Sequence, residues 1–405
     1  MSQAPRWICC QIGGREHYAV PRGLHASGCL EELITDAWSE PSSLTRAIGV
    51  RRLRERFHPG LADAPVWAPN LSSLGFEASL RLGGVEGWDA MLRRNEWFQH
   101  RAAERLAQRG AGRPGERVVL FAYSYAARHL FEFAKSRGWT TVLGQIDPGP
   151  VEERLVTTLH HDHREMAESW RPAPPQYWQH WRDEWQLADR IVVNSEWSRS
   201  ALISEGVPAP RIEVIPLAYE RGAPIAERRY PDAFSEERPL ELLFLGQVNL
   251  RKGIAEMCDA LRLLADVPVR VTVAGPLQVR LPEDMRDHPR VQWVGSVPHG
   301  DTAAFYQAAD VFLFPTHSDG FGLTQLEAMS YGLPVIASQC CGEVVRDGIN
   351  GVRLPDVSGR SIAEAIRALV ARPSALQAMS THAADTRGFK LADLSARLQM
   401  QMRPQ

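Results

Sequence analysis

The sequence predicts an α/β protein built from two doubly wound, Rossmann-like domains that face each other across a cleft. With 405 residues, the chain is too long for one hydrophobic core and fits two domains of about 200 residues each. Short apolar runs alternate with helical patterns along its whole length, which is typical of βαβ units and parallel sheets. This alternation is interrupted once, at residues 221–238, and then starts again.

The N-terminal domain is predicted to span residues 1–220. Its first apolar run, "RWICCQIGG", indicates a strand ending in a glycine turn, and "REHYAVPRGLHASG" indicates a helix that Gly28 ends. The remaining predicted strands lie within 29–38, 117–125, 140–146, 188–195 and 211–220. Helical patterns between these runs predict a parallel sheet.

The linker is predicted at 221–238, where the sequence is charged, contains proline and lacks periodicity. The C-terminal domain follows at 239–388. Its predicted strands lie at 240–248, 269–275, 291–297, 310–316 and 334–338. In such domains ligands bind at the carboxyl ends of the strands and in the cleft between domains.

Composition and charge narrow the class of function. The net charge of -2 gives no overall attraction to nucleic acid or anionic membranes. The basic stretch 50–60 is a local exception, read as a solvated helix face or, alternatively, as a patch that meets a membrane or an anionic acceptor. Six cysteines form no disulfide framework, and the sequence has no long apolar segment. We therefore expect a cytoplasmic protein, with peripheral contact to the inner face of a membrane as an option.

Two loops carry the residues that indicate chemistry. In "FLGQVNLRKGI" (244–254), a strand runs into Gly246 and then into Arg251 and Lys252 before a helix begins. Cations beside exposed amides at a helix N-terminus suit a diphosphate. A basic loop that is merely solvated is the competing interpretation.

The second loop lies in "HSDGFGLTQLEAMSYGLPVIAS" (317–338). Its glycines allow a close approach of the backbone, so the amides of 320–324 would face a phosphate or sugar hydroxyls. Glu327, in the helix that follows, could accept hydrogen bonds from a ribose diol, and Asp319 could meet hydroxyls of a second ring. The alternative is structural, with Glu327 complementing the helix dipole and Asp319 capping the loop.

These motifs resemble a known family. The order of "FLG…KG", "VAG", "VGSVPHGDTAAFYQAADVFLFPT" and "DGFGLTQLEAMSYGLPVIAS" is similar to the C-terminal domain of retaining glycosyltransferases of family 4 (glycosyl transferases group 1), which have the GT-B fold. In the first half, "QIGG" and "ADRIVVNSEWSRSALISEGVPAPRIEVIPLAYE" resemble the same family. The likeness is strongest over 188–355.

The resemblance implies a retaining, metal-independent hexosyltransferase that moves a sugar from a nucleoside diphosphate sugar to a glycan, lipid-linked or small-molecule acceptor. It implies a UDP- or GDP-sugar donor, with UDP favoured, and no metal site. Lys252 would bind the diphosphate, Glu327 the ribose, and Asp319 would be the first acidic residue of the family's E-x7-E motif. The other implied donor contacts are Gly13, Gly14, Gly246, Gln247, Val297, Gly320, Phe321, Gly322 and Leu323, and the implied catalytic groups are Lys252, Asp319 and Arg251.

The sequence departs from the family at two of these positions. The family's arginine before the lysine is Gln247 here, which leaves Arg251 to substitute, and the first acidic residue is an aspartate one methylene shorter. A phosphorylase, a sugar-nucleotide epimerase and a non-catalytic nucleotide-sugar-binding protein therefore remain as alternatives. Tyr123, Gln145 and Asp147 lie at strand ends without an assigned role.

Two further patterns and the C-terminus complete the predictions. "LHHDHREM" (159–166) places His160 and His163 on a polar helix face that could line the acceptor cleft. Trp178, Trp181 and Trp185 form a stripe at helical spacing, which indicates core packing or, alternatively, an aromatic platform for an acceptor sugar. A final helix at 389–402 is expected to cross back to the N-terminal domain.

Overall fold

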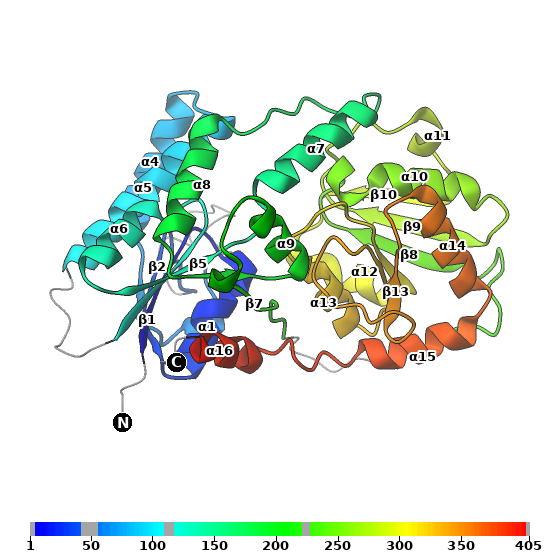
Figure 1. Cartoon of the computed structure of the whole chain (residues 1–405). Helices are drawn as coiled ribbons and strands as arrows, with labels where there is room; N and C mark the ends of the chain where they lie inside the picture. The colour runs from blue at the N-terminus through cyan, green and yellow to red at the C-terminus, as the bar shows by residue number, and fades with distance from the viewer. Residues whose placement is uncertain (1–4, 42–55, 109–116, 221–226, 402–405) are drawn as a thin grey trace.

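The fold consists of two parallel sheets, each covered by helices on both faces. A computed structural model describes residues 5–41, 56–108, 117–220 and 227–401. Figure 1 shows the domain of the first sheet at the left, the domain of the second at the right, and helix α7 (Pro150–Asp162) between them. The prediction of two doubly wound α/β domains is confirmed.

The N-terminal sheet has seven strands in the order β3-β2-β1-β4-β5-β6-β7, all parallel. Its strands are β1 (Arg6–Gln11), β2 (Leu30–Thr35), β3 (Val66–Trp67), β4 (Val118–Tyr123), β5 (Thr140–Gly144), β6 (Arg190–Val193) and β7 (Ile212–Val214). Its helices are α1 (Ala19–Ala26), α4 (Asn70–Leu82), α5 (Gly87–Gln108), α6 (Arg128–Ser136), α7, α8 (Pro175–Leu187) and α9 (Glu196–Ser204), with short 3-10 turns such as η1 (Arg15–Tyr18). The two-residue β3 was not predicted from the sequence.

Successive side chains of β1 alternate between two cores, because neighbouring residues of a strand point to opposite faces. Trp7 and Cys9 are buried against α1, and Ile8 and Cys10 are buried against α5, α6 and α8. Helices thus cover both faces of the sheet, so its apolar runs are nearly continuous, as expected for a buried parallel sheet.

The C-terminal sheet has six parallel strands in the order β10-β9-β8-β11-β12-β13. Its strands are β8 (Leu240–Leu245), β9 (Val269–Ala274), β10 (Val291–Gly295), β11 (Val311–Phe314), β12 (Val335–Ala337) and β13 (Gly351–Arg353), the last of which was not predicted. Its helices are α10 (Ile254–Leu263), α11 (Glu283–Arg286), α12 (Thr302–Ala308), α13 (Leu323–Ser330), α14 (Gly359–Val370) and α15 (Pro373–Ala383), with the 3-10 turn η4 (Leu250–Lys252) after β8. Helices α10 and α14 cover one face, and α12 and α13 cover the other.

The last helix, α16 (Leu391–Met400), lies on the N-terminal domain against α1 (Figure 1). Leu394 and Leu398 are buried in the core that α1 shares with β1. The Oγ atoms of Ser27 and Ser395 are 3.1 Å apart, and a side chain at Gly23 would meet the Ser395 Cβ at 3.1 Å. The close fit of small residues lets the two helices approach.

One predicted element differs in the structure. Residues 15–28 do not form one helix, because Glu16, His17 and Tyr18 have φ of 51°, 51° and 59°. Left-handed backbone at three consecutive non-glycine residues interrupts any helix. The regular helix α1 therefore begins only at Ala19.

No helix in the described ranges combines the length and apolar character needed to cross a membrane. The basic stretch 50–60 lies mostly outside the described residues, so its two interpretations stay open.

Glu184 of α8 holds the turn after β4 in place. Its carboxylate is fully buried and accepts hydrogen bonds from the backbone N–H groups of Tyr125 (2.7 Å) and Ala127 (2.8 Å). Burial raises the pKa of Glu184 to about 7, although these backbone N–H groups oppose the rise. The turn that it fixes carries Tyr125, whose side chain lines a cavity between the domains.

We predict that Glu184 makes stability fall as pH rises. Its pKa is raised in the folded state, so its contribution is complete below about pH 4.5, the value for an unperturbed group, and is lost as pH rises through about 7. Relative to Glu184→Gln, the wild-type free energy of unfolding should decrease by up to about 3 kcal/mol between pH 4.5 and 8, measured by urea unfolding. The exposed Glu165→Gln serves as control. A wild-type to Glu184→Gln difference that is constant with pH would contradict this prediction.

Candidate active site between the two domains

The site lies where the strand order of each sheet reverses. In the C-terminal sheet, chain order starts at β8, goes outward to β9 and β10, and then returns to β11 on the other side of β8. In the N-terminal sheet the same reversal falls between β1 and β4. Ligands of open α/β sheets bind beyond the carboxyl ends of the strands at such a reversal.

The loop after β8 presents Lys252 at this point. Gly246 has a φ of 149°, and a side chain at Gly275, after β9, would collide with the Gly246 carbonyl oxygen. The Asn249 side chain accepts a hydrogen bond from the Lys252 N–H at 3.1 Å and so shapes η4. Gln247 of this loop is exposed.

The loop after β11 meets Lys252 from the neighbouring strand. The Asp319 carboxylate forms an ion pair with the Lys252 ammonium and accepts a hydrogen bond from the Phe321 N–H at 3.2 Å. The Lys252 Nζ also lies 5.0 Å from the centroid of the Phe314 ring. Burial by itself would raise the pKa of Asp319, but Lys252 and Arg251 outweigh it, so the pKa lies below its usual value.

Gly320, Phe321, Gly322 and Leu323 form the start of α13. Gly322 has a φ of 80°, and a side chain there would run into the Phe314 ring. Phe321 is buried, and its carbonyl accepts a hydrogen bond from the Gly342 N–H at 2.9 Å. The loop is therefore rigid, and its glycines are needed by its own packing.

Glu327 is buried one turn into α13 and faces the N-terminal domain. The Tyr306 hydroxyl donates to its Oε2 at 2.8 Å, and the His17 Nε2 lies 3.9 Å from its Oε1. Because His17 belongs to the loop after β1, this contact brings the two reversal points together. His17 was not among the residues predicted from the sequence.

The left-handed run that carries His17 is held on both sides. The Tyr123 hydroxyl donates to the Glu16 carboxylate at 2.9 Å, and Tyr18 is buried edge-on against Trp38. Burial raises the pKa of Glu16, while the hydrogen bond from Tyr123 opposes this. Backbone in such conformations costs about 1–2 kcal/mol per residue and is found concentrated at functional sites.

Gly13 and Gly14 precede this run. The Gly13 N–H donates to Asp36 at 2.7 Å, and Asp36 pairs with Arg56 at 3.2 Å. A side chain at Gly13 would collide with the Arg56 guanidinium. Arg56 therefore brings a cation next to the glycine loop, and sequence analysis had treated it only as part of a basic stretch.

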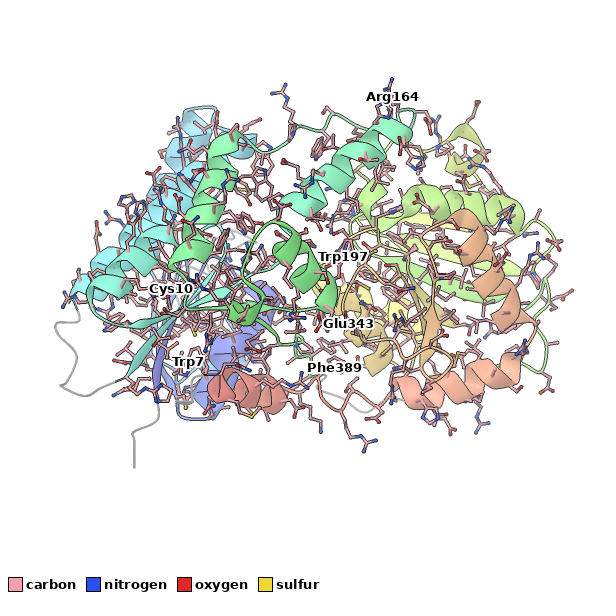
Figure 2. The ribbon with its side chains drawn as sticks, in the orientation of Figure 1. Trp7, Cys10, Arg164, Trp197, Glu343 and Phe389 are labelled. Atoms are coloured by element: carbon pink, nitrogen blue, oxygen red, sulfur yellow. The ribbon has the colours of Figure 1, made fainter. Side chains whose placement is uncertain are left out.

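The two domains touch directly at the loop after β11. A side chain at Gly320 would collide with the Ile146 carbonyl oxygen after β5, and the Ser195 hydroxyl donates to the Gly320 carbonyl at 2.7 Å. The Trp197 indole donates to the Ser318 hydroxyl at 3.1 Å. Figure 2 shows Trp197 close to Glu343 of the other domain at this contact.

Arg251 lies on the other side of the loop from Lys252. Its guanidinium donates to the Ser318 carbonyl at 2.7 Å and pairs with Glu152 of α7 at 3.4 Å. It thus joins the domains and braces the loop rather than pairing with Asp319. Val297 follows the edge strand β10, two strands away from β8.

A cavity of about 490 Å³ opens beside Arg251, between α7, α8 and η4. Asp147 and His160 line it, together with Trp178. Tyr123 and Gln145 lie elsewhere: Tyr123 holds Glu16, and Gln145 is buried behind the wall, where its side chain accepts from the Trp181 indole at 3.0 Å. The Nε2 atom of His163 instead lies 3.5 Å from the Oε1 atom of Glu256 in the C-terminal domain.

The tryptophan stripe of α8 is divided between two roles. Trp181 is buried in the N-terminal core and Trp185 packs against that core. Trp178 is half-buried and reaches the cavity wall. All three tryptophans thus pack in or against the core, and the interpretation of Trp178 as a platform for an acceptor sugar stays a prediction.

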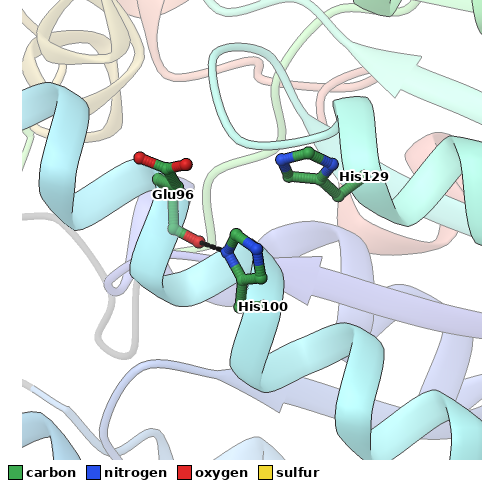
Figure 3. Close-up of side chains that lie close together, drawn as sticks. All are labelled: Glu96, His100 and His129. Atoms are coloured by element: carbon green, nitrogen blue, oxygen red, sulfur yellow. Dashed lines mark hydrogen bonds between the residues drawn. The ribbon is translucent and has the colours of Figure 1, made fainter.

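Among the described residues, one group of side chains could hold a metal ion: Glu96, His100 and His129 (Figure 3). It lies on α5 and at the start of α6. The guanidinium of Arg128 is 3.3 Å from the His129 Nε2, so a cation already occupies the neighbourhood of one ligand atom. None of the implied donor residues takes part in this group.

The fold and the convergent loops define a protein of two Rossmann-like domains whose strand-order reversals face each other. A family model described as "Glycosyl transferases group 1" matches residues 239–372. The D-inositol 3-phosphate glycosyltransferase of Streptosporangium roseum is 30% identical over 310 residues, covering 70% of this chain and 69% of that protein. The chain belongs to the glycosyl transferases group 1.

Other matches agree in fold and differ in extent. The D-inositol 3-phosphate glycosyltransferase of Geodermatophilus obscurus is 32% identical over 216 residues, and the chain spans about half the length of that relative (47% of each). The crystal structure of Anabaena Alr3699/HepE in complex with UDP has a TM-score of 0.62 and 15% identity, covering 98% of this chain and 99% of that one. The predicted GT-B fold is confirmed.

We predict that Gly320→Ala loosens the contact between the domains. Its new Cβ would collide with the Ile146 carbonyl, so the loop or a whole domain must move, at a cost of about 1–3 kcal/mol. The melting temperature should fall, and the radius of gyration from small-angle X-ray scattering should rise. Gly75→Ala, in α4 with open space around its Cβ, should be neutral or stabilising. Unchanged melting and scattering for Gly320→Ala would contradict the prediction.

Proposed function

We propose that the protein transfers a sugar from a nucleoside diphosphate sugar to a hydroxyl acceptor, with retention at the anomeric carbon. The donor binds on the C-terminal domain and the acceptor on the N-terminal domain. Family membership supports the class of reaction, and UDP is the first nucleotide to test because a solved neighbour of this fold binds it. The acceptor is a glycan, a lipid-linked sugar or a small molecule, among which the relatives' names make a phosphorylated polyol one candidate.

The ion pair of Lys252 with Asp319 is the observation that carries this proposal. It joins the loops after β8 and β11 at the reversal of strand order, directly before the N-terminus of α13. Here a diphosphate would find an ammonium group, backbone N–H groups and the positive end of a helix dipole together. Glu327, one turn further on, would accept hydrogen bonds from ribose hydroxyls.

In the reaction, the bond from the anomeric carbon to the diphosphate oxygen breaks, and a bond to the acceptor oxygen forms on the same face. The acceptor proton passes to the departing diphosphate. Negative charge grows on that leaving group, and Lys252 with the loop amides would stabilise it. This placement of counter-charge supports a reaction that needs no metal ion.

Asp319 would change partners during the cycle. It pairs with Lys252 in the described structure, and a diphosphate would compete for the same ammonium group. The released carboxylate could then accept a hydrogen bond from a hydroxyl of the donor sugar. The shorter arm of aspartate suits a role in which the group alternates between two nearby partners.

Other activities of the same fold differ in one measurable respect. A phosphorylase would need inorganic phosphate, an epimerase would convert the donor without an acceptor, and a non-catalytic protein would bind the nucleotide without turnover. Product analysis with and without acceptor separates these from sugar transfer.

We predict that Lys252→Ala abolishes stabilisation by the nucleotide. One of UDP, GDP and ADP at 100 times its dissociation constant should stabilise the wild type by roughly 2.7 kcal/mol, measured by thermal shift. Lys135→Ala removes another lysine that pairs with an aspartate, Asp189, far from the site, and should keep the full shift. An equal shift in the Lys252→Ala variant would refute the diphosphate site.

We also predict that activity does not depend on a metal ion. Sugar transfer should proceed at an unchanged rate in EDTA, because Lys252 supplies the counter-charge. Lys252→Ala should lower kcat/KM by about 10² to 10³, the effect of removing one preorganised donor. A rate that vanishes in EDTA and returns with Mg²⁺ or Mn²⁺ would contradict the metal-independent mechanism. It would not contradict the proposed donor site.

A further inference from the structure

The cavity beside Arg251 adjoins the Lys252 loop, because Asn249 and Arg251 of that loop form part of its lining. Asn249, Arg251 and Gln278 of the C-terminal domain line one part of it. Residues of α7, α8 and the segment between them line the rest, together with Trp88, Tyr125 and Asp147. At about 490 Å³ it is large enough for a small ligand. Arg251 contributes to its wall and also contacts the Ser318 carbonyl, so the cavity lies next to the proposed donor loop.

Aromatic rings line the N-terminal wall of this cavity. Tyr125 and Tyr177 are stacked with centroids 4.6 Å apart, and Tyr177 also contacts Trp88 and Trp178 at 4.9 and 5.1 Å. Trp170 packs on His160 across from them, at 5.5 Å. Tyr125 and Tyr177 are buried and stack on each other, so the half-buried Trp88, Trp170 and Trp178 supply the ring surface open to the cavity. Such surface suits the C–H face of a sugar ring, because it excludes water without requiring a polar partner.

The polar part of the lining is acidic. Four carboxyl groups, of Asp147, Glu152, Glu153 and Glu168, face one guanidinium, that of Arg251. Among the described lining residues, carboxylates therefore outnumber guanidinium groups, and Arg251 is already paired with Glu152.

Two of these carboxylates are fixed by neighbours of the wall. Asp147 accepts hydrogen bonds from the Tyr125 hydroxyl at 2.5 Å and the Gly149 N–H at 2.9 Å. Glu153 accepts from the Trp178 indole at 2.9 Å. The acidic groups and the aromatic rings are thus held as one surface.

We propose that this cavity binds the acceptor as a sugar without an anionic group, either neutral or amino-bearing, and that it rejects phosphorylated acceptors. Hydroxyl or ammonium donors of such a ring would meet the carboxylates while the ring face lies on the aromatic wall. A phosphate group would be repelled by the carboxylates of the lining, and such like-charge repulsion disfavours phosphorylated acceptors. The proposal rests on the sugar transfer proposed above and rules out the phosphorylated polyol among its candidate acceptors.

Saturation-transfer NMR with three matched probes, glucose, glucosamine and glucose 6-phosphate, tests the charge preference without any nucleotide. Glucose and glucosamine should bind on the order of tenfold or more tightly than glucose 6-phosphate. Trp170→Ala should weaken glucose and glucosamine together, since it removes a ring face and no charge. Glucose 6-phosphate binding as tightly as glucose overturns the proposal, and so does the absence of signal from all three probes.

Charge reversal at one position of the lining distinguishes an effect of the cavity from an effect of the overall surface charge. Glu168→Lys should narrow the preference against glucose 6-phosphate by about twofold to fivefold, the size expected for one exposed charge. Glu165→Lys, three residues away and outside the lining, should leave the preference unchanged. Equal effects of both variants would show a bulk charge effect and overturn the assignment to the cavity.

The donor test fails independently of this one. If nucleotides do not bind but glucose and glucosamine still bind more tightly than glucose 6-phosphate, the proposed donor site is refuted and the assignment of the cavity as a sugar site is kept. If UDP binds through Lys252 and glucose 6-phosphate outcompetes glucose, only the inference about the acceptor falls.

Discussion

The contact of the loop after β11 with the N-terminal domain is the constraint on which the rest of the site depends. The Ile146 carbonyl lies against Gly320 of this loop and the Phe314 ring against Gly322, while Phe321 of the loop lies against Gly342 outside it. A side chain at any of the three glycines would collide with its neighbour. The glycines of this loop are therefore required by packing within the protein as well as by any ligand. The same packing contacts fix the direction of the loop amides.

Charges around this loop are arranged so that each domain depends on the other. Ser318 and Asp319 are adjacent, yet they hold cations on opposite sides: Asp319 pairs with Lys252, and the Ser318 carbonyl binds Arg251. Arg251 then reaches Glu152 of the N-terminal domain. Burial raises the pKa of Glu152, and Arg251 opposes that rise. A change of partner at Asp319 would thus affect the adjacent Ser318, whose carbonyl binds Arg251 in the cavity wall.

Sequence patterns predicted the fold well because buried parallel strands leave a strong signal. Lys252 and Asp319 could be identified because each stands beside a glycine in a loop after a strand, and Glu327 because it lies in the helix that follows such a loop. The structure brings Lys252 and Asp319 together. Arg251 carries the same sequence signal, but only the packing of α7 shows that it turns toward Glu152. His17 could not be found, because the sequence "REHY" gives no sign of three left-handed residues. β3 and β13 are two and three residues long, too short to show a periodicity.

The division of the tryptophan stripe shows why pattern alone leaves function open. Trp178 and Trp181 share one helix face, and each has its indole N–H bonded, Trp178 to Glu153 and Trp181 to Gln145. The two rings differ in burial: Trp181 lies within the core, whereas Trp178 packs against that core and also lines the cavity. Since Gln145 precedes and Glu153 follows the turn at Asp147, the same short segment orients both tryptophans and carries an acidic group of the cavity wall. The wall of the proposed acceptor site is therefore continuous with the hydrophobic core, and its shape is set before any ligand arrives.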